Sequence, residues 1–166
     1  APPSSVCKLV HGAYHKKQVS YQAATSTVLD FARAAPPPPR GVGAEVTPAL
    51  LEKAGIRALL VDVDDTLLSS RADELEPNIL TWFASLKAAG IPVAILSNGS
   101  QARVAQIAAE VGVPALSLAG KPFGVAFRRG LRLLGNVEPG RTAMVGDQLF
   151  TDVLGARQAG LKSILV

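Results

Sequence analysis

The 166-residue sequence has little of the material that several classes of protein require. It contains one cysteine, Cys7, which excludes a disulfide framework and a cysteine-based zinc site. Aromatic residues make up only 5% of the chain, too few for the stacking surface of a protein that binds single-stranded nucleic acid. No uninterrupted apolar run approaches the roughly 18 residues of a membrane-spanning helix. Since 48% of the residues are hydrophobic, a disordered chain is excluded as well.

The net charge of +4 comes entirely from the first 40 residues, which hold five basic residues and one acidic residue. Residues 41–166 carry twelve of each, and a run of four prolines at 36–39 separates the two parts. We therefore predict a basic N-terminal extension with a proline-rich linker over residues 1–40 and one folded domain over residues 41–166. Because the folded part has no net charge, no nucleic-acid partner is predicted.

The extension is basic, rich in hydroxyl groups and nearly free of acidic residues. This composition resembles the remnant of an organellar transit segment, which favours a chloroplast or a mitochondrion as the location. The cytoplasm is the alternative if the extension is not such a remnant. A further alternative is that residues 1–40 dock the chain into a larger complex.

After the prolines, apolar strand-like runs alternate with helix-like segments. Strands are predicted over 58–63, 92–96, 115–118, 142–145 and 163–166, and helices over 77–89, 101–111, 123–134 and 149–159. Helical segments end in a glycine followed by an apolar residue, as at Gly90-Ile91 and Gly112-Val113, a pattern typical of helix C-termini. The alternation predicts an α/β fold built from βαβ units with a mostly parallel sheet.

Three carboxylates, Asp62, Asp64 and Asp65, follow the first predicted strand of this domain. The carboxyl ends of parallel strands are where α/β proteins bind ligands. Carboxylates gathered there repel one another, and a divalent cation with a preference for oxygen ligands, such as Mg²⁺, relieves the repulsion. The alternative is a solvated acidic turn, which is disfavoured because Asp62 directly follows a run expected to be buried.

Other polar residues follow the later strands, namely Ser97-Asn98, Lys121, Asp147 and Asp152. If the strands are parallel neighbours, these groups meet the first acidic loop at one edge of the sheet, where they can hold a metal ion and a phosphate. Taken singly, each has another interpretation: Ser97 and Asn98 suit a turn, Lys121 an exposed loop, and Asp152 the start of a helix.

Four stretches in this order resemble the motifs of the haloacid dehalogenase superfamily of phosphohydrolases: Asp62-Val63-Asp64-Asp65-Thr66, Ser97-Asn98, Lys121, and Gly146-Asp147 with Asp152. Over residues 45–166 the sequence is most similar to the capless IIIA branch, which includes YqeG-like phosphatases and the phosphatidylglycerophosphate phosphatases of mitochondria and plastids. Asp65 departs from the asparagine or glutamate of many relatives and leaves both motif aspartates intact.

The resemblance implies a Rossmann-like, three-layer α/β/α fold. Members of the superfamily often insert a cap domain after the first motif or between the second and third. Here 33 positions separate Asp64 from Ser97, and 24 separate Ser97 from Lys121. Each interval is filled by predicted elements of the main fold, so no cap domain is expected.

The resemblance also implies roles for individual residues. Asp62 is the expected nucleophile, Asp64 the general acid and base, and Lys121 the third catalytic residue, which offsets negative charge. Substrate binding is expected from four further residues: Thr66, Ser97, Asn98 and Arg103. The expected Mg²⁺ ligands are Asp62, Asp64 through its backbone carbonyl, Asp147 and Asp152.

The function implied is Mg²⁺-dependent hydrolysis of a phosphomonoester through an aspartyl-phosphate. An open site suits a phosphate carried on something large, and the family points to the lipid headgroup of phosphatidylglycerophosphate, with peripheral contact to a membrane. Three arginines, Arg128, Arg129 and Arg132, are close in one predicted helix and suit either anionic lipid or a solvated face. Two alternatives stay open: an accessory or scaffold subunit in which catalysis is not required, and a protein phosphatase.

Overall fold

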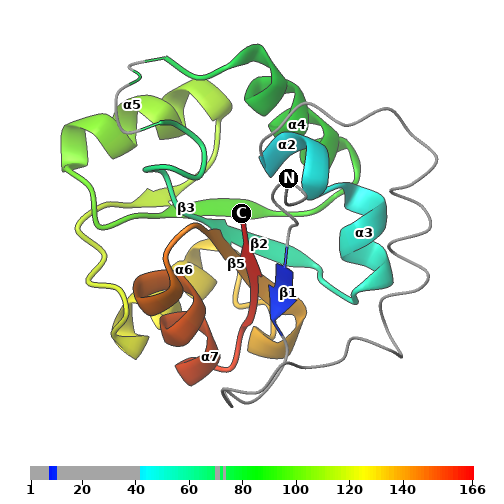
Figure 1. Cartoon of the computed structure of the whole chain (residues 1–166), viewed down its shortest axis with the longest axis vertical. Helices are drawn as coiled ribbons and strands as arrows, with labels where there is room; N and C mark the ends of the chain where they lie inside the picture. The colour runs from blue at the N-terminus through cyan, green and yellow to red at the C-terminus, as the bar shows by residue number, and fades with distance from the viewer. Residues whose placement is uncertain (1–7, 11–41, 70–71, 73) are drawn as a thin grey trace, which may run out of the picture.

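The computed structural model describes residues 8–10, 42–69, 72 and 74–166 (Figure 1). Its centre is a six-stranded sheet in the order β1-β6-β5-β2-β3-β4. Five strands run parallel: β2 (Ala58–Val61), β3 (Val93–Leu96), β4 (Ala115–Leu116), β5 (Thr142–Gly146) and β6 (Lys162–Leu165). Strand β1 (Lys8–Val10) pairs antiparallel with β6 at the edge. The predicted α/β class with a mostly parallel sheet is confirmed.

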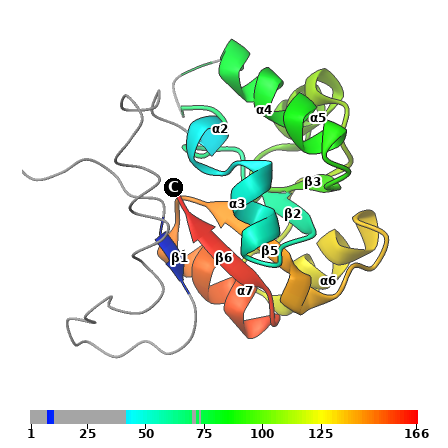
Figure 2. The ribbon, with the colours of Figure 1, turned by 90° about the vertical axis from the view of Figure 1, so that its right-hand side faces the viewer.

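Helices cover both faces of this sheet (Figure 2). One layer consists of α2 (Val42–Glu45), α3 (Pro48–Lys53), α4 (Pro77–Ala88) and α5 (Gln101–Val111). The other consists of α6 (Gly124–Leu133) and α7 (Gly155–Gln158). A short turn of 3-10 helix, Pro139–Arg141, precedes β5. This confirms the three-layer arrangement. Among the described helices, none has the length and apolar character needed to cross a bilayer.

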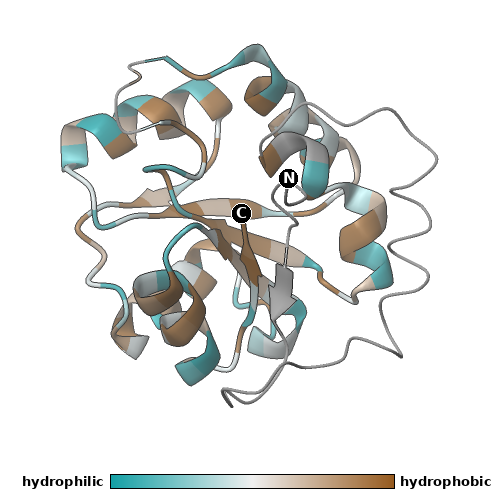
Figure 3. Cartoon of the chain, in the orientation of Figure 1, coloured by the Kyte–Doolittle hydropathy of each residue, from teal (hydrophilic) through white to brown (hydrophobic). Residues whose placement is uncertain are grey.

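Strands β2, β3 and β5 are buried at every position because they have a helical layer on each side. Along β2, Leu59 and Val61 pack into the core under α2 to α5, whereas Leu60 packs into the core with α6 and α7. Side chains alternate between the faces of a strand, so a strand covered on both faces is apolar at every position. Figure 3 shows this contrast, with hydrophobic strands at the centre and helices of mixed character around them.

The predicted helix ends are found at the glycines. Gly90 and Gly112 have φ angles of 68° and 70°, in the left-handed region that side chains with a Cβ rarely adopt. The N–H of the following residue returns to the last turn, from Ile91 to the Leu86 carbonyl at 3.0 Å and from Val113 to the Ala108 carbonyl at 3.1 Å. These bonds satisfy helix carbonyls that would otherwise have no partner.

Several elements near the strand ends are shorter than predicted. Strand β2 stops at Val61 because the next residues fold into a tight loop, in which the N–H groups of Leu67 and Leu68 both donate to the Val63 carbonyl. Asp65 in this loop has a φ of 56°. Strand β4 has only two residues, and Leu118 beyond it has a φ of 45°.

The predicted helix over 149–159 is divided in two. Residues Leu149–Leu154 form a π-helical turn, and α7 continues from Gly155. In this turn the N–H groups of Asp152 and Val153 both donate to the Gln148 carbonyl, at 3.1 and 3.2 Å. Such wide turns are frequent at functional sites because they redirect side chains out of the regular helical register.

The connections where a cap was excluded contain only elements of the main fold. Between Asp64 and Ser97 the described chain forms the tight loop, α4 and β3, and between Ser97 and Lys121 it forms α5 and β4. No cap domain is seen in the part of the chain that the structure describes. Of the proposed extension, only Lys8–Val10 is described, as β1; the proline-rich linker and the rest of residues 1–40 lie outside the described residues.

Candidate active site

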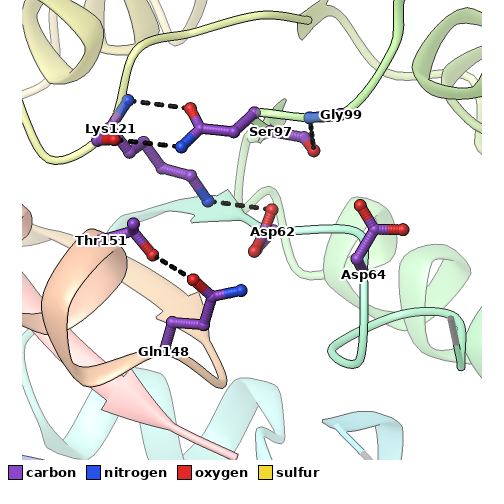
Figure 4. Close-up of a pocket in the computed structure, with 8 residues that line it drawn as sticks. Asp62, Asp64, Ser97, Gly99, Lys121, Gln148 and Thr151 are labelled. Carbon is purple, nitrogen blue, oxygen red and sulfur yellow. Dashed lines mark hydrogen bonds and ion pairs between the residues drawn. The ribbon is translucent and has the colours of Figure 1, made fainter.

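The carboxyl ends of the central strands surround a pocket of about 220 Å³. Asp62 follows β2, Ser97 follows β3, and Lys121 lies in the loop after β4. Figure 4 shows these side chains converging from separate loops. The pocket is lined by Asp62, Asp64, Ser97, Asn98, Gly99, Lys121, Gln148 and Thr151. The tertiary structure therefore brings together residues from all four sequence motifs, as the parallel topology predicted.

The Lys121 ammonium lies between two carboxylates. Its Nζ is 2.9 Å from Asp62 Oδ1 and 2.6 Å from Asp152 Oδ1, and the side chains of all three residues are almost completely buried. The Asp62 contact is drawn in Figure 4. A buried charge is tolerated only when it is paired, and here one cation offsets two anions. Lys121 is thus placed to reduce the repulsion between Asp62 and any negatively charged group that approaches it.

Asn98 holds the loop that carries Lys121. Its Oδ1 accepts hydrogen bonds from the N–H groups of Gly120, at 3.0 Å, and Lys121, at 2.9 Å. Its Nδ2 donates to the Lys121 carbonyl at 3.0 Å. The amide is therefore committed to the backbone around Lys121, and the expected contact of Asn98 with substrate stays a prediction.

Asp152 is the most deeply buried acid of the site, with 1% of its surface exposed. Burial raises its pKa to about 6, although the charge of Lys121 acts in the opposite direction. Its Oδ2 accepts from the Gln148 N–H at 3.2 Å. The carboxylate fits against β5 only because residue 146 is a glycine: a Cβ there would lie 2.3 Å from Asp152 Oδ2.

Three acids form a cluster that fits a metal ion. Carboxylate oxygens of Asp62, Asp147 and Asp152 lie within 4.8 Å of one another. Asp147 Oδ1 is buried and has no hydrogen-bond partner among the described residues. Burial and, to a smaller extent, the charge of Asp62 raise the pKa of Asp147. An unsatisfied oxygen in an all-carboxylate cluster matches the ligand preference of Mg²⁺. The side chain of Asp64 is not part of the cluster.

Asp64 lies at the pocket beside an arginine from α5. Arg103 Nε is 3.3 Å from Asp64 Oδ1, and an Arg103 Nη donates to the Ala72 carbonyl at 3.2 Å. The Asp64 side chain is 38% exposed, whereas Asp62 is buried, so the two carboxylates of one motif have different surroundings. Arg103 does not line the pocket, and its expected contact with substrate stays a prediction.

Ser97 and Thr66 differ in their relation to the pocket. Ser97 lines it, and its buried Oγ accepts from the Gly99 N–H at 2.9 Å. Thr66 is buried in the tight loop after β2 and does not line the pocket. Its Oγ1 has no hydrogen-bond partner within the described part of the chain. The expected roles of both residues in substrate binding stay predictions.

Besides Gly99, two residues that line the pocket, Gln148 and Thr151, were not identified from the sequence. The Thr151 hydroxyl donates to Gln148 Oε1 at 2.9 Å, which leaves the Gln148 amide nitrogen facing the pocket in Figure 4. Both residues lie inside the motif that runs from Gly146 to Asp152. Their position between two motif aspartates was the signal available in the sequence.

A buried lysine paired with a strand-end aspartate, beside an acidic cluster, in a three-layer α/β fold agrees with the family match of the sequence. Residues 43–160 match the model of the haloacid dehalogenase-like hydrolases, and the chain belongs to this family. It is 35% identical over 121 residues to the probable phosphatase YqeG of Bacillus subtilis, a match that covers 73% of this chain and 70% of that protein. The chain is thus a phosphatase of the haloacid dehalogenase type.

Solved structures support the fold. A haloacid dehalogenase phosphatase from Thermococcus onnurineus is 17% identical with a TM-score of 0.56, over 65% of this chain and 85% of that one. An uncharacterized protein from Corynebacterium glutamicum is 26% identical with a TM-score of 0.53, over 67% and 85% of the two chains. These likenesses extend over most of the described domain.

Proposed function

We propose that this phosphatase hydrolyses phosphomonoesters with Mg²⁺ through an aspartyl-phosphate on Asp62. The observation that carries the proposal is the buried contact of 2.9 Å between Lys121 Nζ and Asp62 Oδ1 at the floor of a pocket that Asp64 also lines. The contact keeps a carboxylate oxygen at a fixed position beside a cation. A phosphate group has to bind at this position if the carboxylate is to attack it.

The reaction has two steps. An oxygen of Asp62 attacks phosphorus in line with the leaving oxygen, so a carboxylate–phosphorus bond forms as the ester bond breaks. Asp64 gives its proton to the leaving oxygen. Asp64 then takes a proton from a water molecule, which attacks phosphorus and releases inorganic phosphate and the free Asp62 carboxylate. Asp64 lines the pocket with 38% of its side chain exposed, so both the leaving oxygen and a water molecule can reach its carboxylate.

Charge neutralisation is divided between the chain and the cation. Lys121 offsets the charge of Asp62 as phosphate approaches, and Asn98 keeps Lys121 in place through three hydrogen bonds. Asp62, Asp147 and Asp152, with the Asp64 carbonyl, would hold Mg²⁺, which supplies positive charge next to the phosphoryl group. Ser97 lies at the same pocket, where its hydroxyl can hold a phosphate oxygen.

The substrate we propose is phosphatidylglycerophosphate. The pocket is small and open, and no cap covers it in the described part of the chain. A site of this kind encloses little more than the phosphate itself, so it favours a phosphate presented on a large body. The sequence resemblance to phosphatidylglycerophosphate phosphatases favours a lipid headgroup as that body.

The first experiment tests the chemistry with an aryl phosphate in Mg²⁺ and in EDTA. The Asp62→Asn variant should lose at least a thousandfold in kcat, because its amide is a poor nucleophile. Asp65→Asn is the matched control: it makes the same change three residues away on an exposed side chain outside the pocket lining, and asparagine tolerates the positive φ of this position. Equal activity of wild type and Asp62→Asn would refute the mechanism.

A second experiment tests the substrate. Phosphate release from phosphatidylglycerophosphate in mixed micelles is compared with release from phosphoserine and phosphotyrosine peptides at equal concentration. A higher kcat/KM for the lipid supports the proposal. A clear preference for peptides would indicate a protein phosphatase instead, and the absence of hydrolysis of any substrate by folded, Mg²⁺-loaded protein would indicate a scaffold.

A further inference from the structure

Large apolar side chains lie exposed in the loops that carry pocket-lining residues. Four of them have more than half of their surface exposed: Leu118 68%, Phe123 70%, Leu149 57% and Phe150 64%. We refer to these four residues as the apolar rim. Scattered exposed aliphatic residues are common, but two phenylalanines and two leucines exposed in two adjoining loops indicate a surface that is covered in use.

Each residue of the rim adjoins a residue that lines the pocket. The Leu118 N–H donates to the Gly99 carbonyl at 3.2 Å, and Phe123 comes two residues after Lys121. Leu149 and Phe150 lie between Gln148 and Thr151 in the sequence. The rim thus belongs to two loops, the β4–α6 connection and the π-helical turn after β5, both at the edge of the sheet that holds the pocket.

These two loops pack against each other. A Cβ added at Gly155, directly after the π-helical turn, would lie 3.0 Å from Pro122 Cα, next to Phe123 in the chain. The backbones are therefore in close contact at the base of the rim. The four apolar side chains are therefore carried by two loops that meet beside the pocket.

Basic side chains lie next to the rim. Helix α6 begins immediately after Phe123 and carries three exposed arginines, Arg128, Arg129 and Arg132, and no acidic residue. A Cβ at Gly124 would lie 3.4 Å from Arg128 Nη1, so this guanidinium extends back over the first turn of α6 towards Phe123. Arg129 is the next residue along the helix, whereas Arg132 lies in the last turn of α6, farther from Phe123.

We infer that the apolar rim and the arginines of α6 dock the protein onto an anionic phospholipid bilayer. The exposed Phe and Leu side chains enter the interfacial region of the bilayer, and the guanidinium groups pair with lipid phosphates. Exposed apolar side chains with cations beside them match a bilayer, which has anionic headgroups around an apolar interior. A neutral apolar partner would leave the arginines without counter-charges.

The position of the rim favours a bilayer over a protein partner. A protein bound to the rim would block access to the pocket, whereas a bilayer bound there brings headgroup phosphates to it. This step rests on the proposed lipid substrate. Membrane binding does not depend on catalysis, so the docking inference and the proposed function can each be refuted without the other.

The test measures how much of the full chain sediments with lipid vesicles. One set of vesicles contains phosphatidylcholine alone, and the other contains about 30 mol% of the anionic lipid phosphatidylglycerol. The Phe123→Ser/Phe150→Ser variant should lose at least tenfold in partitioning onto anionic vesicles. Arg128→Gln should lose about fivefold, as expected for one cation near an anionic surface. Leu80→Ser is the control, because Leu80 is also an exposed leucine (38%) but lies on α4, in the opposite helical layer.

The readouts separate docking from chemistry. All variants should hydrolyse a soluble aryl phosphate at the wild-type rate, because the rim and α6 do not line the pocket. Partitioning of the double variant within twofold of wild type, or equal wild-type binding to neutral and anionic vesicles, would overturn the inference. A dimer in solution that the double variant abolishes would also overturn it, in favour of a second copy of the chain as the occupant of the rim.

Discussion

The Gly146→Ala substitution tests whether the site depends on the close fit between β5 and Asp152. The added Cβ would lie 2.3 Å from Asp152 Oδ2, 2.4 Å from its Cγ and 2.8 Å from its Cβ. Because nearly the whole carboxyl side chain is in the way, a small rotation does not relieve the clash. Asp152 has to move, and its contact of 2.6 Å with Lys121 Nζ is lost.

The cost has two components. Overpacking of a buried site destabilises a protein by about 1–3 kcal/mol. Loss of a hydrogen bond between charged groups adds about 1.5–3 kcal/mol, and release of the buried Asp152 carboxylate offsets part of this. We expect the free energy of unfolding to fall by about 3 kcal/mol. Because Lys121 and a ligand of the acidic cluster are both displaced, kcat should fall at least tenfold and half-saturation should require more Mg²⁺.

Urea denaturation and the Mg²⁺ dependence of aryl phosphate hydrolysis measure these effects. Gly140→Ala is the matched control, because a Cβ at Gly140 meets no atom within 4 Å. The control should stay within about 0.5 kcal/mol of wild type and keep its Mg²⁺ requirement. If Gly146→Ala behaves like Gly140→Ala in both assays, the Asp152 carboxylate is not held as described and the reasoning is wrong.

Two further predictions concern the neighbours of Lys121. Asn98→Ala removes three hydrogen bonds from the loop that carries Lys121 and should lower kcat about 10- to 100-fold. Equal kcat values for wild type and Asn98→Ala would contradict the positioning role. Burial raises the pKa of Asp152 from 3.8 to about 6, so the native state binds more protons than the unfolded state between these values, and stability falls as the pH rises. Urea denaturation in EDTA should show wild type losing about 2 kcal/mol relative to Asp152→Asn between pH 4 and pH 7, and parallel pH curves for the two proteins would contradict the assignment.

Much of the fold could be predicted because local chemistry and global architecture agree. The run at 58–61 is apolar at every position, which only a strand covered on both faces requires, and the structure buries all four residues. The predicted helix over 101–111 agrees with α5 at both ends, since Gly112 supplies the left-handed residue that stops it. Helix α2 was not predicted, because four residues are too few for helical periodicity to be detected.

From the sequence, the site could be predicted only as a group of residues that follow strands and lie at one edge of the sheet. Motif order and parallel topology were enough to expect Asp62, Lys121 and Asp152 at one edge of the sheet. They were not enough to show that Asn98 is used on the backbone of the Lys121 loop, or that Arg103 reaches Asp64. Those contacts join residues more than twenty positions apart and depend on loop conformations that no local pattern specifies.

The amino-acid sequence by itself determined the layers, the strand ends and the type of chemistry, because burial, helix ends and charge spacing are local properties. Only the tertiary structure decided the geometry of the charges: one ammonium between two carboxylates, an acid cluster with an unsatisfied oxygen, and an apolar rim beside the opening. The physical reason is that the energies of buried charges and exposed apolar surfaces depend on the distance between segments, and that distance is fixed only when the sheet is assembled.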